Sequence, residues 1–297
     1  MKKFYTVVIS LLFISINLFS AINFAQVDDL YIKDEIDQVQ DILDDNLKNA
    51  TTNKDKAEIY WRISRNLINL GDKAESDSEK LNLFNKGLDY AQKSIDTYDN
   101  FNAHLWKSSN IGRIGQTKGI LKSLSAASDM RKDLKIILND FKELNSSETW
   151  YVLGELYTAV PGGFISFGND NYGISYYRIA VDTIPNNVIY PNHYKSLAQA
   201  LYDRNWSKNK RRKEFKDINS NWERESLVYE KYAYYEGIEK GNNTPYYSSV
   251  ALNKMSDRQE AVMLLNYAIA KFNVYSYHTD SAIEAIDEVK KLKSQWT

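Results

Sequence analysis

Four aromatic residues recur at an almost constant spacing, and this period restricts the fold more than any other feature of the chain. Trp61, Trp106, Trp150 and Tyr194 are separated by 45, 44 and 44 residues. A fixed period of this length is the signature of stacked structural repeats. The 297 residues include only 12 Gly and 4 Pro, too few breakers for the many turns of a β-sandwich or barrel. The sequence therefore predicts an array of helical hairpins.

The third unit contains a local motif that identifies the kind of repeat. Trp150, Leu153, Gly154 and Tyr157 match the first-helix pattern of a tetratricopeptide repeat (TPR). In that pattern the bulky residues pack between two helices, and the small residue allows a close crossing. A standard unit is about 34 residues, so the longer period indicates longer helices or linkers. We predict an all-α, TPR-like superhelix of about four helical hairpins with helical caps at both ends.

Segment boundaries follow from apolar periodicity and from capping signals. We expect one N-terminal capping helix over residues 27–50, TPR-like repeats over 54–220 and a C-terminal helical cap of three helices over 221–297. The first hairpin is expected to pair Lys54–Leu70, ended by Gly71, with Lys80–Tyr98. Capping-box spacings predict that later helices open near Asn145, Ser256 and Ser281.

The first residues have the pattern of a targeting segment. Met1, Lys2 and Lys3 are followed by the nearly all-apolar stretch Phe4–Phe19, which predicts a signal peptide over residues 1–25 with cleavage after Ala25. The alternative is an uncleaved N-terminal anchor, because Phe4–Ala25 is just long enough to span a bilayer. The sequence contains no cysteine, which excludes a cysteine-linked lipid and disulfides. We expect an exported periplasmic or cell-envelope protein that is not a lipoprotein and meets the membrane only through an uncleaved segment.

The charge balance and the scarcity of reactive residues argue against several function classes. Lys and Arg (38) nearly cancel Asp and Glu (39), which disfavours nucleic acid as a partner. The basic run 208–213 is interpreted as a solvated helix face, with an acidic partner protein as the alternative. The three histidines lack metal-ligand spacing, and His104 and His193 are expected to be structural at the start of first helices. The sequence predicts no enzyme, no metal and no cofactor; carboxylates converging in a groove would be the alternative.

Candidate binding residues are placed by the geometry of a repeat array. First helices line the concave surface of such an array, so residues there are expected to face a ligand or partner, with packing inside the array as the alternative: Arg65, Asn110, Arg113, Tyr151 and Tyr157. In the loop 161–173, Phe164, Phe167 and Asp170 are candidate ligand contacts. The alternative is a connector in which Asp170 caps the next helix.

The stretch from Glu58 to about Phe215 resembles a known family. Residues 106–119, Trp150–Tyr157 with Pro161, and Phe167–Asp170 are similar to the T component of TatT-type TRAP transporters, a periplasmic TPR-like family, and more distantly to the regulator of microtubule dynamics proteins. The resemblance implies a non-enzymatic, often oligomeric periplasmic protein that works beside a solute-binding protein and passes a small, apolar ligand. The missing lipidation cysteine, and Asn169 in place of a glycine, depart from the family pattern.

Two functions remain open from the sequence. One is a scaffold that binds a small ligand or a solute-binding protein, and the other is a structural envelope scaffold without a small ligand. A long open groove would favour ligand binding, and a filled surface would favour assembly.

Overall fold

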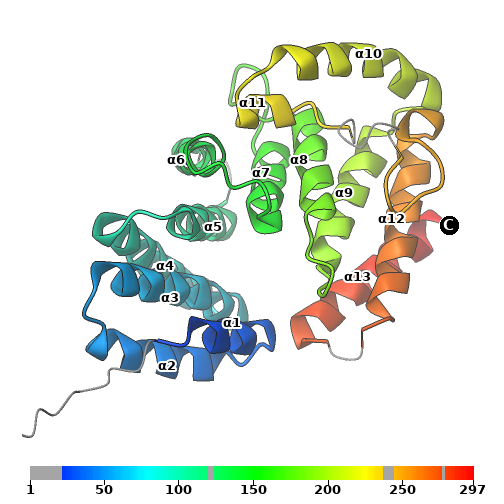
Figure 1. The fold of residues 1–297 in the computed structure, drawn as a ribbon. Helices are drawn as coiled ribbons and strands as arrows, with labels where there is room; N and C mark the ends of the chain where they lie inside the picture. The colour runs from blue at the N-terminus through cyan, green and yellow to red at the C-terminus, as the bar shows by residue number, and fades with distance from the viewer. Residues whose placement is uncertain (1–21, 120–123, 237–243, 276–277) are drawn as a thin grey trace, which may run out of the picture.

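The computed structural model describes residues 22–119, 124–236, 244–275 and 278–297 (Figure 1). The predicted signal peptide lies almost wholly outside these described residues. Within them the chain is all-α, and the one β feature is an isolated bridge between Gly162 and Gly168. The α-helices are α1 (Phe24–Ile32), α2 (Ile36–Asn49), α3 (Asn53–Lys73), α4 (Asp77–Thr97), α5 (Phe101–Lys118), α6 (Leu124–Lys135), α7 (Ser147–Ala159), α8 (Asp170–Asp182), α9 (Pro191–Arg204), α10 (Lys208–Arg224), α11 (Val228–Tyr232), α12 (Asp257–Phe272) and α13 (Asp280–Trp296). A π-helical segment, η2 (Ile136–Asp140), continues α6, and a 3-10 turn, η4 (Leu252–Lys254), precedes α12.

Successive helices pack as hairpins, which confirms the predicted fold class. The pairs α3/α4, α5/α6 and α7/α8 follow one another along the array (Figure 1). The four aromatic anchors fall one to each first helix, on α3, α5, α7 and α9. Trp61, Trp150 and Tyr194 are at most 5 % exposed. The 44 to 45 residue period therefore marks a buried position on α3, α7 and α9, whereas Trp106 on α5 is half-buried.

The fourth hairpin is completed by a helix distant in sequence. Helix α9 packs mainly against α12, and the intervening α10 and α11 lie across the ends of α8 and α9 (Figure 1). Helix α10 spans the boundary expected at residue 220, so the C-terminal segment begins inside a helix. An apolar cluster contributed by α8, α9, α12 and α13 fills this end of the molecule.

Buried ion pairs hold α12 in this position. Arg211 on α10 reaches Asp257 and Glu260 of α12, and Arg204 on α9 donates to both carboxylate oxygens of Asp257, over 2.8 and 3.0 Å. Arg211 is 6 % exposed, so the expectation of a solvated face over 208–213 is wrong for this residue. Its neighbours on the run, Lys208, Lys210, Arg212 and Lys213, are exposed.

Local differences from the expected boundaries have identifiable causes. Gly71 does not end α3; the ring of Phe84 packs so closely on it that a Cβ there would lie 2.3 Å from Phe84 Cε1. Residues 27–50 form two helices, because the chain turns at Asp34 with a φ of 63°. Thr279, and not Ser281, caps α13, whereas the capping box of Ser256 with Gln259 is present as predicted.

Candidate functional site

A cavity of about 610 Å³ lies between the first two repeats and the last two. Its walls come from α5, α6, α7 and α9, and Ile68 of α3 closes one end; we call it the central groove. The volume falls within the range of about 300–1,000 Å³ that small-ligand sites occupy. Its apolar side chains belong to Ile68, Trp106, Ile111, Ala126, Ala127, Met130, Val152, Leu156, Ala159 and Val160, and its polar ones to Ser109, Arg113, Gln116, Glu148, Tyr151, Glu155, Asn192, Lys195 and Ser196.

The floor of the central groove is open because small residues face it. Gly112 and Gly115 line it from α5, and a Cβ on Gly112 would lie 3.1 Å from the terminal methyl of Met130. Helix α6 contributes Ala126 and Ala127 on the same side. The absence of bulky side chains at these positions leaves room that a standard hairpin contact would fill.

One wall carries a connected set of hydroxyl groups around a carboxylate. Glu155 on α7 accepts from the Tyr177 hydroxyl at 2.9 Å and from the Ser196 hydroxyl at 2.8 Å. The Tyr151 hydroxyl is 3.3 Å from Ser196 Oγ. Burial, and the nearby Glu155 charge, raise the pKa of Tyr151. Tyr151 therefore stays a neutral phenol, and these side chains are fixed before any ligand arrives.

Tyr151 is also stacked flat on His193, with ring centroids 4.2 Å apart and planes 9° apart. His193 is 6 % exposed, and burial lowers its pKa to about 3. The imidazole is therefore neutral at ordinary pH and is not a ready proton donor. We interpret His193 as a structural residue that packs behind Tyr151.

The opposite wall carries Arg113 from α5. Its guanidinium donates to Asp72 Oδ2 at 2.8 Å and to Gln116 Oε1 at 3.0 Å. Burial raises the pKa of Asp72 despite the Arg113 charge beside it. Lys195 on α9 is likewise paired, with Glu288 of α13. Because these groove cations have carboxylate partners, the site suits an occupant of mixed apolar and polar character more than a strongly charged one.

Two of the remaining candidates, Arg65 on α3 and Asn110 on α5, pack against neighbouring helices. Arg65 donates to Asp28 Oδ1 at 2.8 Å and lies over the ring of Tyr31, 3.7 Å from its centroid. Asn110 is fully buried and donates to Ser64 Oγ of α3 at 3.0 Å. Neither side chain lines the central groove.

The other candidates lie in the last turn of α7 and in the loop and first turn of α8 that follow it. Tyr157 is buried, and its hydroxyl pairs with that of Tyr229. Phe164 is fully exposed, whereas Phe167 packs edge-on against Tyr157. Asp170 is exposed in the first turn of α8, but the capping side chain is that of Asn169, which accepts from two backbone amides. Among the eight residues named from the sequence, the structure places Arg113 and Tyr151 in the groove.

Sequence reasoning missed several groove residues that lie on the same helix faces as these two. Gln116 follows Arg113 by three positions, and Glu155 follows Tyr151 by four. Residues at these spacings share one side of a helix, so the pattern was available in the sequence. Asn192 and Ser196 of α9 had no such signal, because the fourth repeat has only a faint motif.

In the part of the chain that the structure describes, no group of three or more His, Asp or Glu side chains is arranged to hold a metal ion. The buried His104 is held between Asp133 Oδ1, at 2.8 Å, and Asp99 Oδ1, at 2.9 Å, where it ties α5 to α6. A search of the described helices also finds none long and apolar enough to cross a membrane.

Comparison with known proteins gives one family resemblance. A search of curated proteins returns no match. Residues 23–160, somewhat less than half of the chain, match the family model of regulator of microtubule dynamics protein 1-3. The match covers α1 to α7, and with them three of the four helices that wall the groove. Over this region the chain is similar to the regulator of microtubule dynamics family.

Proposed function

We propose that this protein is a non-enzymatic scaffold that binds an extended segment of a partner protein in the central groove. The observation that carries the proposal is the composition of the groove walls. Gln116 on α5 and Asn192 on α9 contribute amide groups to a lining that also holds apolar side chains. An amide side chain both donates and accepts, which matches the backbone of an extended polypeptide.

The electrostatics of the groove support binding rather than catalysis. Tyr151 has a raised pKa, the buried ring of His193 is neutral, and Glu155 already accepts two hydroxyl groups. A catalytic acid or base is instead expected to titrate near its working pH. The likeness to a family of TPR-like proteins points the same way.

A second occupant is favoured by the size of the cavity. A volume of about 610 Å³ with ten apolar side chains in its lining can hold a small apolar ligand. In this version the protein is exported and acts in the periplasm as an accessory to a TRAP-type transporter, beside a solute-binding protein and as an oligomer. The apolar N-terminal stretch and the sequence resemblance support it. Detection of intact Met1 by mass spectrometry of the mature protein would contradict cleavage after Ala25.

Site-specific crosslinking in cells distinguishes these functions. A photoreactive residue replaces Gln116, which is exposed and lines the groove, and a control replaces Lys216, which is exposed on α10. We expect protein adducts from position 116 that position 216 does not give. A solute-binding protein among them would support the transporter role, and envelope components would support an assembly scaffold. Identical adducts from both positions would contradict a groove-bound partner.

A further inference from the structure

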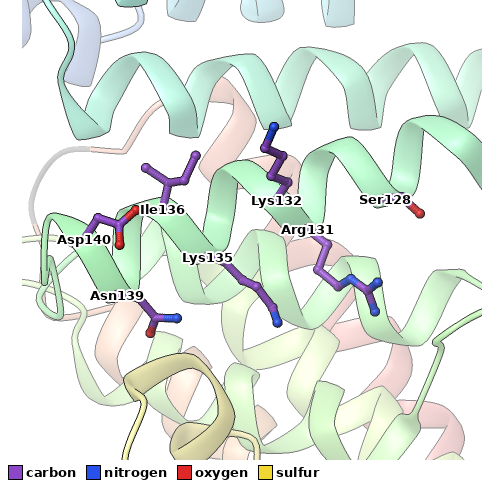
Figure 2. A pocket seen from close by; sticks show the side chains of 7 residues that line it. All are labelled: Ser128, Arg131, Lys132, Lys135, Ile136, Asn139 and Asp140. Carbon is purple, nitrogen blue, oxygen red and sulfur yellow. The ribbon is translucent and has the colours of Figure 1, made fainter.

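A second recessed surface runs along the outer side of α6 and η2. It is a shallow furrow of about 310 Å³, which we call the α6 furrow, lined by Ser128, Arg131, Lys132, Lys135, Ile136, Asn139 and Asp140. Figure 2 shows Arg131, Lys135 and Asn139 extending from one side of the helix, and Lys132 and Ile136 from the other. Helix α6 turns Ala126, Ala127 and Met130 toward the central groove, so the two sites lie on different faces of it.

Arg131 is held in place by an aromatic ring and not by a carboxylate. Its Cζ lies 3.9 Å from the centroid of Phe167. Among the described residues no carboxylate lies within ion-pair distance of this guanidinium. Stacking fixes the plane of the guanidinium and leaves its in-plane N–H groups available, the arrangement that recognises a carboxylate through two parallel hydrogen bonds.

Helix α11 contacts two more side chains that line the furrow, Lys135 and Asn139. Lys135 Nζ lies 4.3 Å from the ring centroid of Tyr229 and 3.0 Å from Glu230 Oε1. Asn139 Oδ1 accepts from the Tyr229 backbone amide at 3.1 Å, which leaves the Asn139 amide NH₂ free to donate into the furrow. The side chains that line the furrow include three cations and one carboxylate, Asp140. Glu230 and Asp140 offset two of these three positive charges, so the furrow keeps a net positive charge, and Arg131 carries it without a carboxylate partner in the described part of the chain.

The loop that carries Phe167 also carries an exposed apolar tip. Phe167, on which Arg131 stacks, belongs to the loop between α7 and α8, and three residues earlier Phe164 is 111 % exposed. Ile165 beside it is 69 % exposed. Exposed aromatic residues next to arginine are typical of the anchors of protein interfaces.

We propose that the α6 furrow, together with Phe164 and Ile165 of the loop that packs on Arg131, docks an acidic segment of a partner protein that also carries apolar side chains. The carboxylates of that segment pair with Arg131 and Lys135, and its apolar residues cover Phe164 and Ile165. The furrow lies between Arg131, Lys135 and Asn139 on one side and Lys132 and Ile136 on the other. An extended chain segment fits into this space, whereas a flat bilayer does not enter it.

The test uses a fluorescent synthetic decapeptide of alternating Glu and Leu, with a Lys–Leu peptide as its charge control. Anisotropy is measured on the full chain with Arg131→Gln, Arg131→Lys, Lys135→Gln and Phe164→Ala. We expect the acidic peptide to bind more weakly as salt rises, and Arg131→Gln to weaken it about tenfold. Arg131→Lys keeps the charge but loses the planar fork, and we expect it to recover only part of the affinity. The matched control is Arg212→Gln, at an exposed arginine on α10 that donates to Asn209 Oδ1.

Three outcomes would overturn this inference. The first is an equal loss of peptide affinity in Arg212→Gln and Arg131→Gln. The second is a loss in Arg113→Ala but not in Arg131→Gln, which would assign the peptide to the central groove and leave the proposed function intact. The third is co-sedimentation with anionic phosphatidylserine vesicles that requires Arg131 and Phe164 while the peptide does not bind. Circular dichroism of each variant confirms that the fold is retained.

Discussion

The guanidinium of Arg178 on α8 and the carboxylate of Glu260 on α12 form a buried ion pair between residues 82 positions apart. Glu260 is fully buried and also accepts from Arg211 and from the Tyr247 hydroxyl. These contacts lower the pKa of Glu260 against the opposing effect of burial. Together with the Arg204–Asp257 pair and the apolar contacts of α9, they hold α12 where it completes the fourth hairpin.

Removing the charge of Glu260 should destabilise the protein. Glu260→Gln leaves Arg178 and Arg211 buried without their shared carboxylate, and breaking one partner of a buried pair costs about 3–5 kcal/mol. The free energy of unfolding, measured by urea denaturation, checks this. Glu284→Gln is the control, because Glu284 is exposed on α13. Equal stability of the two variants would contradict a structural role for the ion pair.

Gly154 should not tolerate even a methyl group. A Cβ at this position would lie 2.3 Å from Tyr177 Cδ1 at the crossing of α7 and α8. We expect Gly154→Ala to lower the free energy of unfolding by about 1–3 kcal/mol through overpacking. Gly112→Ala is the matched control, since its Cβ meets only the end of the flexible Met130 and Ala favours a helix. A neutral Gly154→Ala would show that α7 and α8 can move apart.

Stability should fall on mild acidification because of His193. The unfolded imidazole takes up a proton below its ordinary pKa of 6.5, whereas the folded one stays neutral down to about 3. The free energy of unfolding therefore decreases as pH falls through this window, by at most about 1.4 kcal/mol per pH unit. His193→Phe keeps a ring beside Tyr151 but cannot titrate.

We expect the slope of stability against pH between about 6.5 and 5 to be smaller in His193→Phe than in the wild type. This interval avoids the acid range in which Asp28, Asp257 and Glu260 lose their paired charge, since their folded pKa values are lowered. Identical slopes would show that His193 is protonated in the folded protein.

The sequence predicts the hairpins where local spacing determines them. Trp61, Trp106, Trp150 and Tyr194 mark the four first helices because each packs inward at the same place in its repeat. The pairing of α9 with α12 was not predicted, because it depends on apolar contacts and buried ion pairs between residues that are distant in sequence. Gly71 was misassigned for a similar reason, since only the tertiary contact with Phe84 distinguishes a packing glycine from a helix end.

The candidate site was harder to predict than the fold. Arg113 and Tyr151 line the groove, yet Asn110 lies three positions before Arg113 and is buried against Ser64. A single turn of α5 thus serves both the packing between repeats and the groove. The angle at which repeats stack determines which side chains pack between repeats and which line the groove. The sequence period does not determine that angle.

The most direct test of the account fills the central groove without altering the fold. Ala126 lines the groove from α6, and Ser125 beside it is exposed and does not. We predict that Ala126→Trp lowers the yield of protein crosslinked through position 116 at least about tenfold, because the indole ring would occupy the space of the bound segment. Ser125→Trp should leave this yield unchanged. An undiminished yield from a folded Ala126→Trp variant would contradict binding in the groove.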